Sequence, residues 1–337
     1  MPRARPVGRP VRRQRDDHEP RQQPQRAVRG RRRAPVGRRR GAEHRRIPAD
    51  RRPDGRSALG RDHLVTHSRT RIHELLDASG LAPRRDLGQN FVADPNTVRR
   101  IASLARVGPG DRVVEIGAGL GSLTIALAET GAEVLAVEVD PGVVALLREV
   151  AEPLPNVTVV EGDAMHLDWT ELLAGHDDWT LVANLPYNVA TPLVCDLLDG
   201  VPAITSMLVM VQREVAERMA AGPGSRTYGA VSVKVAFWAD AKVVATVPAS
   251  VFVPRPNVES ALIRIDRRPP PDVDADALFS LVRQAFGQRR KMLRRSLHDV
   301  VRPEQFAAAG VAPDARPEQL ALDDWCRLAG AVTREGS

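Results

Sequence analysis

The chain of 337 residues is long enough for two domains of about 100–200 residues each. No run of about 18 apolar residues occurs, which predicts no membrane-spanning helix, and the arginine-rich N-terminus lacks the apolar segment of a secretory signal. Cys195 and Cys326 have neither a zinc-binding nor a disulfide spacing. We therefore expect a cytoplasmic protein with two ordinary thiols and no metal site.

The net charge of +7 is distributed unevenly along the chain. Residues 1–64 hold 21 of the 49 basic and 7 of the 42 acidic residues, so this segment carries +14 and the remainder −7. The segment is rich in Arg, Pro and Gly, a composition that cannot bury enough apolar surface to offset the entropy of ordering. We expect a disordered extension, which is not translated if Val65 serves as the start. A basic arm that binds RNA by counterion release is the alternative.

From residue 66 onward, apolar periodicity predicts strands that alternate with helices. Strands are expected at 112–116, 133–139, 157–160, 179–183, 204–211, 231–237 and 258–265. Helices are expected at 70–78, 122–129, 142–150 and 191–198, and a further one is capped by Asp94. This alternation indicates an α/β fold with a Rossmann-like, doubly wound parallel sheet over residues 65–268. After a proline-rich linker at 269–272, helices expected at 277–286, 292–300, 303–308 and 317–329 form a small all-α domain over residues 272–332.

Three predicted strands end in residues that suit a nucleoside ligand. Gly117 and Gly119 belong to a G-x-G-x-G turn after the first strand, and this spacing differs from the G-x-G-x-x-G that cradles a pyrophosphate. Glu138 ends the second strand, where a carboxylate can accept hydrogen bonds from ribose hydroxyls. Asp163 follows the third strand and can bind an adenine amine. Each acid alone reads as a solvated loop residue, but together they predict a site for S-adenosylmethionine.

The fourth predicted strand runs into Asn184-Leu185-Pro186-Tyr187. The side-chain amide, the proline-fixed turn and the aromatic ring stand where ligands bind in open α/β sheets. An amide oxygen and a backbone carbonyl can accept hydrogen bonds from a planar amine, and a ring can stack on its base. The alternative is a plain proline turn with a surface tyrosine.

In combination, several motifs make the chain resemble the rRNA adenine dimethyltransferase family, over about residues 87–329. The resemblance is to those bacterial members that dimethylate two adjacent adenines near the 3′ end of small-subunit rRNA. The matching stretches are LGQNFV at 87–92, EIGAGLG at 115–121, VEVD at 137–140, GDA at 162–164, NLPYN at 184–188, QREVAERM at 212–219, YGAVSV at 228–233, VPASVFVPRPNVESAL at 247–262 and AFGQRRKMLRRSL at 285–297.

The resemblance implies a role for each candidate of the cofactor site. Asn90 and the backbone near Val92 would close over the methionine end, and the turn with Gly117 and Gly119 would touch the cofactor. Glu138 would bind the ribose, Asp163 the adenine, and Asn184 would lie between the cofactor and the target base. The chain departs from the family pattern at three positions, which are Val92, Ala118 and Arg255. The last adds a charge at the rim of the catalytic pocket.

For catalysis we expect the Asn184 side-chain oxygen and the Leu185 carbonyl to accept the two hydrogens of an adenine amine. Pro186 would fix the turn, and Tyr187 would stack on the base. Phe252 is the expected second aromatic clamp, with core packing as its alternative. The base would have to leave its stack to enter such a pocket. No general base is needed, because placement and desolvation suffice for attack on a sulfonium methyl.

The resemblance implies dimethylation of two adjacent adenosines in a hairpin loop of 16S rRNA, within a small-subunit precursor. The sequence does not settle the oligomeric state, for which a monomer is the default expectation. A local basic cluster without interspersed acids is the expected RNA contact, and it consists of Arg283, Arg289, Arg290, Lys291, Arg294 and Arg295. Its alternative is a solvated basic helix end. Three other functions remain open: a resistance-type enzyme for large-subunit rRNA, a ribosome assembly factor that mainly binds, and a DNA methyltransferase.

Overall fold

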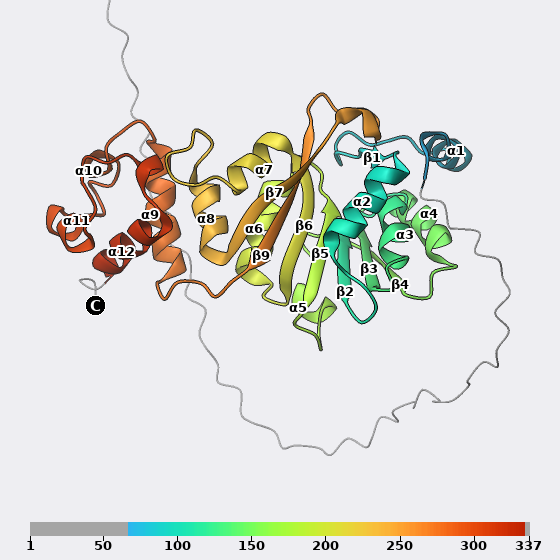
Figure 1. The fold of residues 1–337 in the computed structure, drawn as a ribbon, viewed down its shortest axis with the longest axis horizontal. Coiled ribbons are helices and arrows are strands. Elements are labelled where there is room, and N and C mark those ends of the chain that lie inside the picture. Colours follow the sequence, from blue (N-terminus) through green and yellow to red (C-terminus); the bar gives the residue numbers. More distant parts are fainter. Residues whose placement is uncertain (1–66, 334–337) are drawn as a thin grey trace, which may run out of the picture. The chain divides into compact units, whose positions relative to one another are not determined.

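The structure, a computed structural model, describes residues 67–333 (Figure 1). The expectations for residues 1–64 therefore lie outside the described part of the chain. A seven-stranded sheet with the order β4-β3-β2-β5-β6-β9-β7 forms its centre. The strands are β2 (Arg112–Ile116), β3 (Glu133–Glu138), β4 (Val157–Glu161), β5 (Trp179–Asn184), β6 (Ile204–Gln212), β7 (Ala239–Val247) and β9 (Ser260–Arg267).

The sheet is parallel from β4 to β6, which confirms the predicted Rossmann-like arrangement. It is not parallel throughout, because β9 pairs antiparallel with β6 and β7 pairs antiparallel with β9. β7 was not expected from the sequence. Half-buried residues alternate with exposed ones along it (Ala239–Val247), as suits the edge of the sheet, and this weak apolar signal explains why it was missed.

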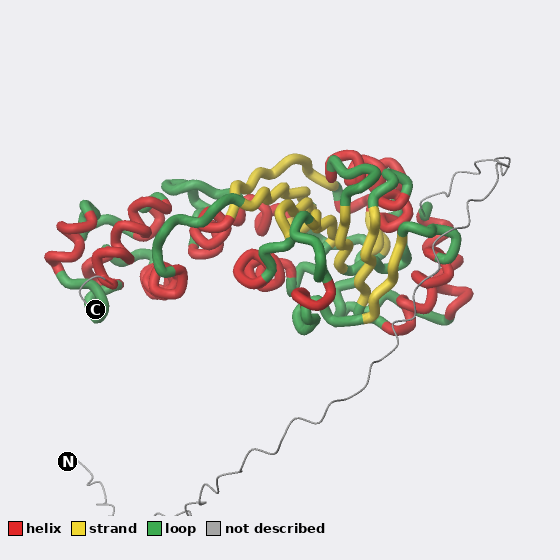
Figure 2. Tube along the Cα trace, turned by 90° about the horizontal axis from the view of Figure 1, so that it is seen from below, coloured by secondary structure: helices red, strands yellow, loops and turns green. Residues whose placement is uncertain are grey.

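Helices cover both faces of the sheet (Figure 2). Neighbouring strand residues point to different cores: Val113 packs with α2 (Pro95–Ala105) and α3 (Ser122–Ala128), whereas Val114 packs with α6 (Ala190–Gly200). Burial on both faces is the reason that the central strands read as nearly continuous apolar runs. The remaining helices of this part are α4 (Pro141–Ala151), α5 (Trp169–Leu172) and α7 (Arg213–Met219).

The strand expected at 231–237 is wrong, because these residues lie in the helix α8 (Ala230–Trp238). Val231 and Val235 join the core beneath the sheet, whereas Val233 and Phe237 join the core of the C-terminal helices. Each pair is four residues apart, so the helix is apolar on two opposite faces. In the sequence, two opposite apolar helix faces produce the same alternation of apolar and other residues as a strand.

A helix and a two-stranded sheet complete the carboxyl edge of the main sheet. α1 (Arg69–Ser79) confirms the first predicted helix, with Ser68 as its N-cap and Gly80 as its left-handed C-cap. β1 (Phe91–Val92) pairs antiparallel with β8 (Phe252–Val253), which follows the 3-10 helix η1 (Ala249–Val251). Segments more than 150 residues apart in the chain thus meet at this edge.

The C-terminal region is helical, as predicted, although two of its helices are shorter than expected. The helix expected at 292–300 is only α10 (Leu293–Ser296) followed by turns, and the one expected at 317–329 is divided into η2 (Pro317–Gln319) and α12 (Leu322–Thr333). α9 (Ala275–Gly287) and α11 (Pro303–Ala309) agree with the prediction. Their core also includes Tyr228, Val233 and Phe237, which precede the domain boundary proposed near residue 268. The apolar core of the C-terminal helices therefore extends across that boundary.

None of the helices within residues 67–333 combines the length and the apolar character that crossing a membrane requires.

Candidate cofactor and methyl-transfer site

A cavity opens at the carboxyl ends of β2, β3 and β5, the edge at which parallel sheets bind ligands. It encloses about 780 Å³ of empty space, a volume that includes open solvent at its mouth. Four stretches line it, together with Glu115: residues 87–92, 117–120 with Ser122 and Leu123, Glu138 with Val139, and 184–187. The sheet therefore brings together most of the predicted site residues, which are up to about 100 positions apart.

The glycine-rich turn adopts the left-handed conformations that only glycine tolerates easily, with φ of 71° at Gly117 and 57° at Gly119. A Cβ atom at Gly119 would come within 3.1 Å of the Phe91 ring, so a side chain at this position would displace that ring. Gly121 has a different role: it begins α3, and a Cβ there would press on Val150 of α4 at 2.9 Å. Only the first two glycines line the cavity.

Glu138 is buried at the end of β3, with 5% of its surface exposed. Its carboxylate accepts backbone hydrogen bonds from Gly119 (2.8 Å), Val139 (3.0 Å) and Asp140 (3.1 Å). Burial raises the pKa of this carboxyl, and the three N–H donors oppose that rise. The side chain is thus fixed beside the glycine turn, where a diol could approach its oxygens.

Asp163 follows β4, as predicted, but it does not line the cavity. Its side chain is 48% exposed, and the carboxylate accepts hydrogen bonds from the Met165 N–H (3.0 Å) and from His166 Nδ1 (2.8 Å). The bond from Met165 is the main reason that the pKa of Asp163 is lowered. Its role toward an adenine remains a prediction.

Asn184 is oriented by a contact across the cavity. Its Nδ2 donates to the Asn90 carbonyl at 2.9 Å, while the Asn90 side chain donates to the Gly88 carbonyl at 2.9 Å. Because the amide nitrogen of Asn184 is the donor in this bond, its oxygen stays available as an acceptor. This is the orientation that the predicted acceptor role requires.

Leu185 and Pro186 continue the cavity wall, and Tyr187 closes it. The Leu185 N–H donates to the Met210 carbonyl at 3.0 Å, which extends the β5–β6 pairing by one residue. The Tyr187 hydroxyl lies 2.7 Å from the Ser260 Oγ, and burial raises the pKa of this tyrosine. The hydroxyl is therefore anchored in the protein, and the ring is held at the wall.

Phe252 lies elsewhere than the clamp prediction requires. Its side chain is fully buried, with 0% exposure, and it packs with Val92 and Leu262 in the core. It pairs with Val92 in the β1–β8 ladder and lines no part of the cavity. The alternative reading, core packing, therefore describes this structure, and a stacking role would require the ring to leave the core.

Two polar groups of the cavity were not singled out from the sequence. Glu115 is 1% exposed, and it accepts a hydrogen bond from Thr124 Oγ1 at 2.6 Å. Its burial raises its pKa to about 8. Ser122 is also buried, and its Oγ has no hydrogen-bond partner among the described residues. Only Glu115 had a sequence signal, because it stands two residues before the first glycine of the turn.

The predicted RNA-contact cluster is exposed at all six positions. It is less free of acids than its sequence suggests, since Arg289 lies 3.5 Å from Glu318 and Arg294 lies 2.5 Å from Asp314.

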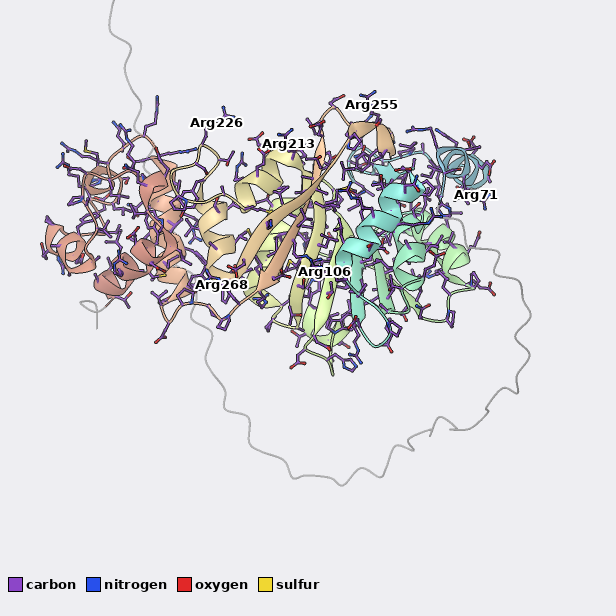
Figure 3. The ribbon with its side chains drawn as sticks, in the orientation of Figure 1. Arg71, Arg106, Arg213, Arg226, Arg255 and Arg268 are labelled. Atoms are coloured by element: carbon purple, nitrogen blue, oxygen red, sulfur yellow. The ribbon has the colours of Figure 1, made fainter. Side chains whose placement is uncertain are left out.

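Arg255 is exposed on the loop before β9 and lines a neighbouring depression, not the cofactor cavity (Figure 3). The charge of Arg255 therefore lies outside the lining of the cofactor cavity.

A mostly parallel sheet with a glycine turn, a buried carboxylate and an asparagine at its strand ends is typical of a Rossmann-like S-adenosylmethionine-dependent methyltransferase. The cavity fits that cofactor in three ways. Two glycines leave space against the turn, and Glu138 offers buried acceptors. The Ser122 hydroxyl, which has no hydrogen-bond partner within residues 67–333, can bind a polar group of a ligand.

Residues 80–333 match the family model described as "Ribosomal RNA adenine dimethylase". The chain therefore belongs to the ribosomal RNA adenine dimethylase family, whose members act on rRNA.

Curated relatives and solved structures agree with this membership. A protein of Cutibacterium acnes named "Ribosomal RNA small subunit methyltransferase A" is 45% identical over 283 residues, or 79% of this chain and 94% of the relative. A protein of the same name from Kineococcus radiotolerans is 46% identical over 269 residues, covering 77% and 89%. The structure of a dimethyladenosine transferase from Plasmodium falciparum has a similar fold, with a TM-score of 0.61 at 23% identity, covering 72% and 97%. The 23S rRNA methyltransferase ErmE gives a TM-score of 0.56 at 26% identity, covering 72% and 99%.

Proposed function

We propose that this protein dimethylates the exocyclic amines of two adjacent adenosines in a hairpin loop near the 3′ end of 16S rRNA. S-adenosylmethionine is the methyl donor, and the substrate is a precursor of the small ribosomal subunit. Relatives named for small-subunit rRNA, 45% and 46% identical and spanning 94% and 89% of their own lengths, support this assignment. We further propose that the protein acts as a monomer in the cytoplasm, where such precursors are assembled.

The orientation of Asn184 is the observation that carries the proposed chemistry. The bond from its Nδ2 to the Asn90 carbonyl leaves Oδ1 as an acceptor for one hydrogen of the target amine. The Leu185 carbonyl would accept the second hydrogen. Two acceptors in these positions draw the amine nitrogen toward tetrahedral geometry and direct its lone pair across the cavity.

S-adenosylmethionine, when bound, supplies a methyl group on a positively charged sulfur. The protein then needs to hold the amine close, exclude water and fix the base. Tyr187 supports the last task, because it lines the cavity and its hydroxyl lies 2.7 Å from the Ser260 Oγ. We propose that Glu138 holds the ribose hydroxyls and that the strand after Asn90 covers the methionine end.

Replacing Asn184 by Ala tests the acceptor role. The variant should lose methyl transfer by at least about 100-fold, the cost of misplacing a reactant, and should keep its affinity for the small-subunit particle. Asn188→Ala is the matched control, because Asn188 is exposed just after the motif and does not line the cavity. The measurement is incorporation of labelled methyl groups, with particle binding determined in parallel. Retained transfer in Asn184→Ala would refute the proposed chemistry.

A large-subunit rRNA substrate is the second candidate, favoured by the similarity to the ErmE structure. Methylation of pre-small-subunit particles and of protein-free 23S rRNA distinguishes the two. Activity on the particles only would support the proposal, and activity on 23S rRNA only would replace it. Mass analysis of 16S rRNA from cells lacking the gene should show two missing dimethyladenosines.

A further inference from the structure

His67 and α1 contact the glycine-rich turn of the cofactor site. His67 lies just before α1 and is buried, with 5% exposure. Its Nε2 lies 2.7 Å from the carbonyl oxygen of Leu120. A carbonyl can only accept, so Nε2 carries the proton and His67 is the donor.

The hydrogen bond from His67 ends on Leu120, which lies within the glycine-rich turn. Leu120 stands between Gly119 and Gly121, whose φ angles of 57° and 84° are both left-handed. Glycines have the widest conformational freedom, so a turn built from them is not fixed by its own backbone. Leu120 also lines the cavity, and its movement would change the wall against which a cofactor lies.

Apolar packing holds the same residue from the same side. Leu120 is 2% exposed and shares a core with Ile72 and Leu76 of α1 and with Phe91 of β1. Phe91 is a second wall residue of the cavity, and its ring fills the space beside Gly119. α1 thus rests on two parts of the cavity wall at once.

A second polar contact links α1 to the strand that supports β1. Arg69 donates from Nη2 to the Ser250 carbonyl at 2.7 Å and from Nη1 to the Phe252 carbonyl at 3.3 Å. Phe252 pairs with Val92, and the Ala93 N–H donates to the Val251 carbonyl at 2.7 Å. The contact of Arg69 is therefore transmitted by the β1–β8 pair to the wall residues 91 and 92.

We propose that His67 and Arg69 are positioning residues for S-adenosylmethionine, which hold the glycine turn and the β1–β8 pair in the geometry that binds the cofactor. Neither side chain lines the cavity, so both act through the backbone carbonyls that they bind. The inference uses only the cofactor site of the proposed function. It does not depend on which RNA is the substrate.

The test is direct calorimetric binding of S-adenosylmethionine to variants of the full chain. His67→Phe keeps an aromatic ring but removes the donor, and it should raise the Kd about fivefold, the effect of one hydrogen bond. His67→Gln can present an amide Nε2 at a similar reach and should restore the Kd to within about twofold. Asp77→Ala is the control, because Asp77 is exposed on the last turn of the same helix.

A steady-state measurement separates positioning from general damage. The KM for S-adenosylmethionine should rise in His67→Phe, while kcat at saturating cofactor stays within about twofold. An unchanged Kd in His67→Phe would overturn the role of His67, as would a fall in kcat alone. Arg69→Met gives an independent test should His67→Phe not fold, and an unchanged Kd in this variant would overturn the role of Arg69. Because the readout is cofactor binding, loss of rRNA methylation for other reasons leaves the result interpretable.

Discussion

At the scale of single residues, the site contains a buried acid with a pH-dependent effect on stability. The pKa of Glu115 is raised by burial from an ordinary value of 4.5 to about 8, and the nearby Glu138 adds to the rise. Between about pH 5 and pH 8, the folded protein therefore holds a proton that the unfolded chain has lost. The folded state binds more protons, so the free energy of unfolding must decrease as the pH rises through this window.

Replacing Glu115 by Gln should remove this contribution. The substitution keeps an oxygen that can accept from Thr124 and cannot ionise. In urea titrations between pH 5 and pH 8.5, the wild-type protein should lose up to about 1.4 kcal/mol per pH unit from this group. The variant should show a flatter curve, whereas Glu129→Gln, at an exposed position at the end of α3, should not differ from the wild type. Parallel curves for wild type and Glu115→Gln would contradict the assignment.

Sequence reasoning found the site residues whose signal is local. Gly117, Gly119, Glu138 and Asn184 each follow an apolar strand, and the parallel sheet brings those strand ends to one cavity. Sequence reasoning could not predict whether a given side chain is buried or exposed in the fold. Phe252 has the motif of a clamp, but its exposure is set by distant residues such as Leu262, and the structure buries it.

At the scale of elements, the errors share a physical cause. The helix α8 was predicted as a strand because its two apolar faces alternate in sequence, although they serve different cores. The short helices α10 and η2 were predicted too long, because a run of helix-favouring residues does not reveal the tertiary contacts that end it. Long, one-sided patterns such as those of α2 and α9 were predicted correctly.

Arg267 illustrates a contact between elements that leaves no mark in the sequence. Its guanidinium donates to the carbonyls of four residues between the end of α6 and the start of β6, which are Leu197 (3.1 Å), Leu198 (2.8 Å), Val201 (3.2 Å) and Ile204 (3.0 Å). These partners lie 63 to 70 positions earlier in the chain. Leu197 and Val201 also accept from backbone N–H groups, so the side chain adds a second donor there and supplies a donor to the Leu198 carbonyl at the helix end.

Arg267→Lys should destabilise the fold although it keeps the charge. A lysine ammonium has three donors on a flexible stem and cannot reproduce the planar fork, so at least one buried carbonyl loses its partner. We expect a loss of about 1–3 kcal/mol in the free energy of unfolding, measured by urea denaturation. Lys242→Ala on the exposed side of β7 is the control, with an expected change within about 0.5 kcal/mol. A loss for Arg267→Lys no greater than that of the control would show that the fork contributes nothing.

At the scale of the whole molecule, the C-terminal helices and the region that holds the sheet are joined by a shared apolar core as well as by the linker. Tyr228, Val233 and Phe237 precede the proline-rich linker but are buried in the C-terminal core, at 2%, 0% and 1% exposure. The Tyr228 hydroxyl donates to the Leu320 carbonyl at 2.9 Å, and the Gly224 N–H donates to the Glu318 carbonyl at 2.7 Å. A boundary set by composition near residue 268 therefore does not predict two independent folding units.

A chain that ends at Arg268 should accordingly be less stable than the full chain. It exposes three large side chains that each contribute about 1.5–3 kcal/mol when buried. We expect a lower Tm and binding of a hydrophobic dye. The control is the full-length double substitution Arg290→Gln and Arg295→Gln, which changes only exposed members of the basic cluster. It should keep the wild-type Tm and bind the rRNA substrate more weakly and with less salt dependence. If the truncated chain instead melted with the full chain and bound no dye, the shared core would be irrelevant to stability, and the C-terminal helices would serve RNA contact alone.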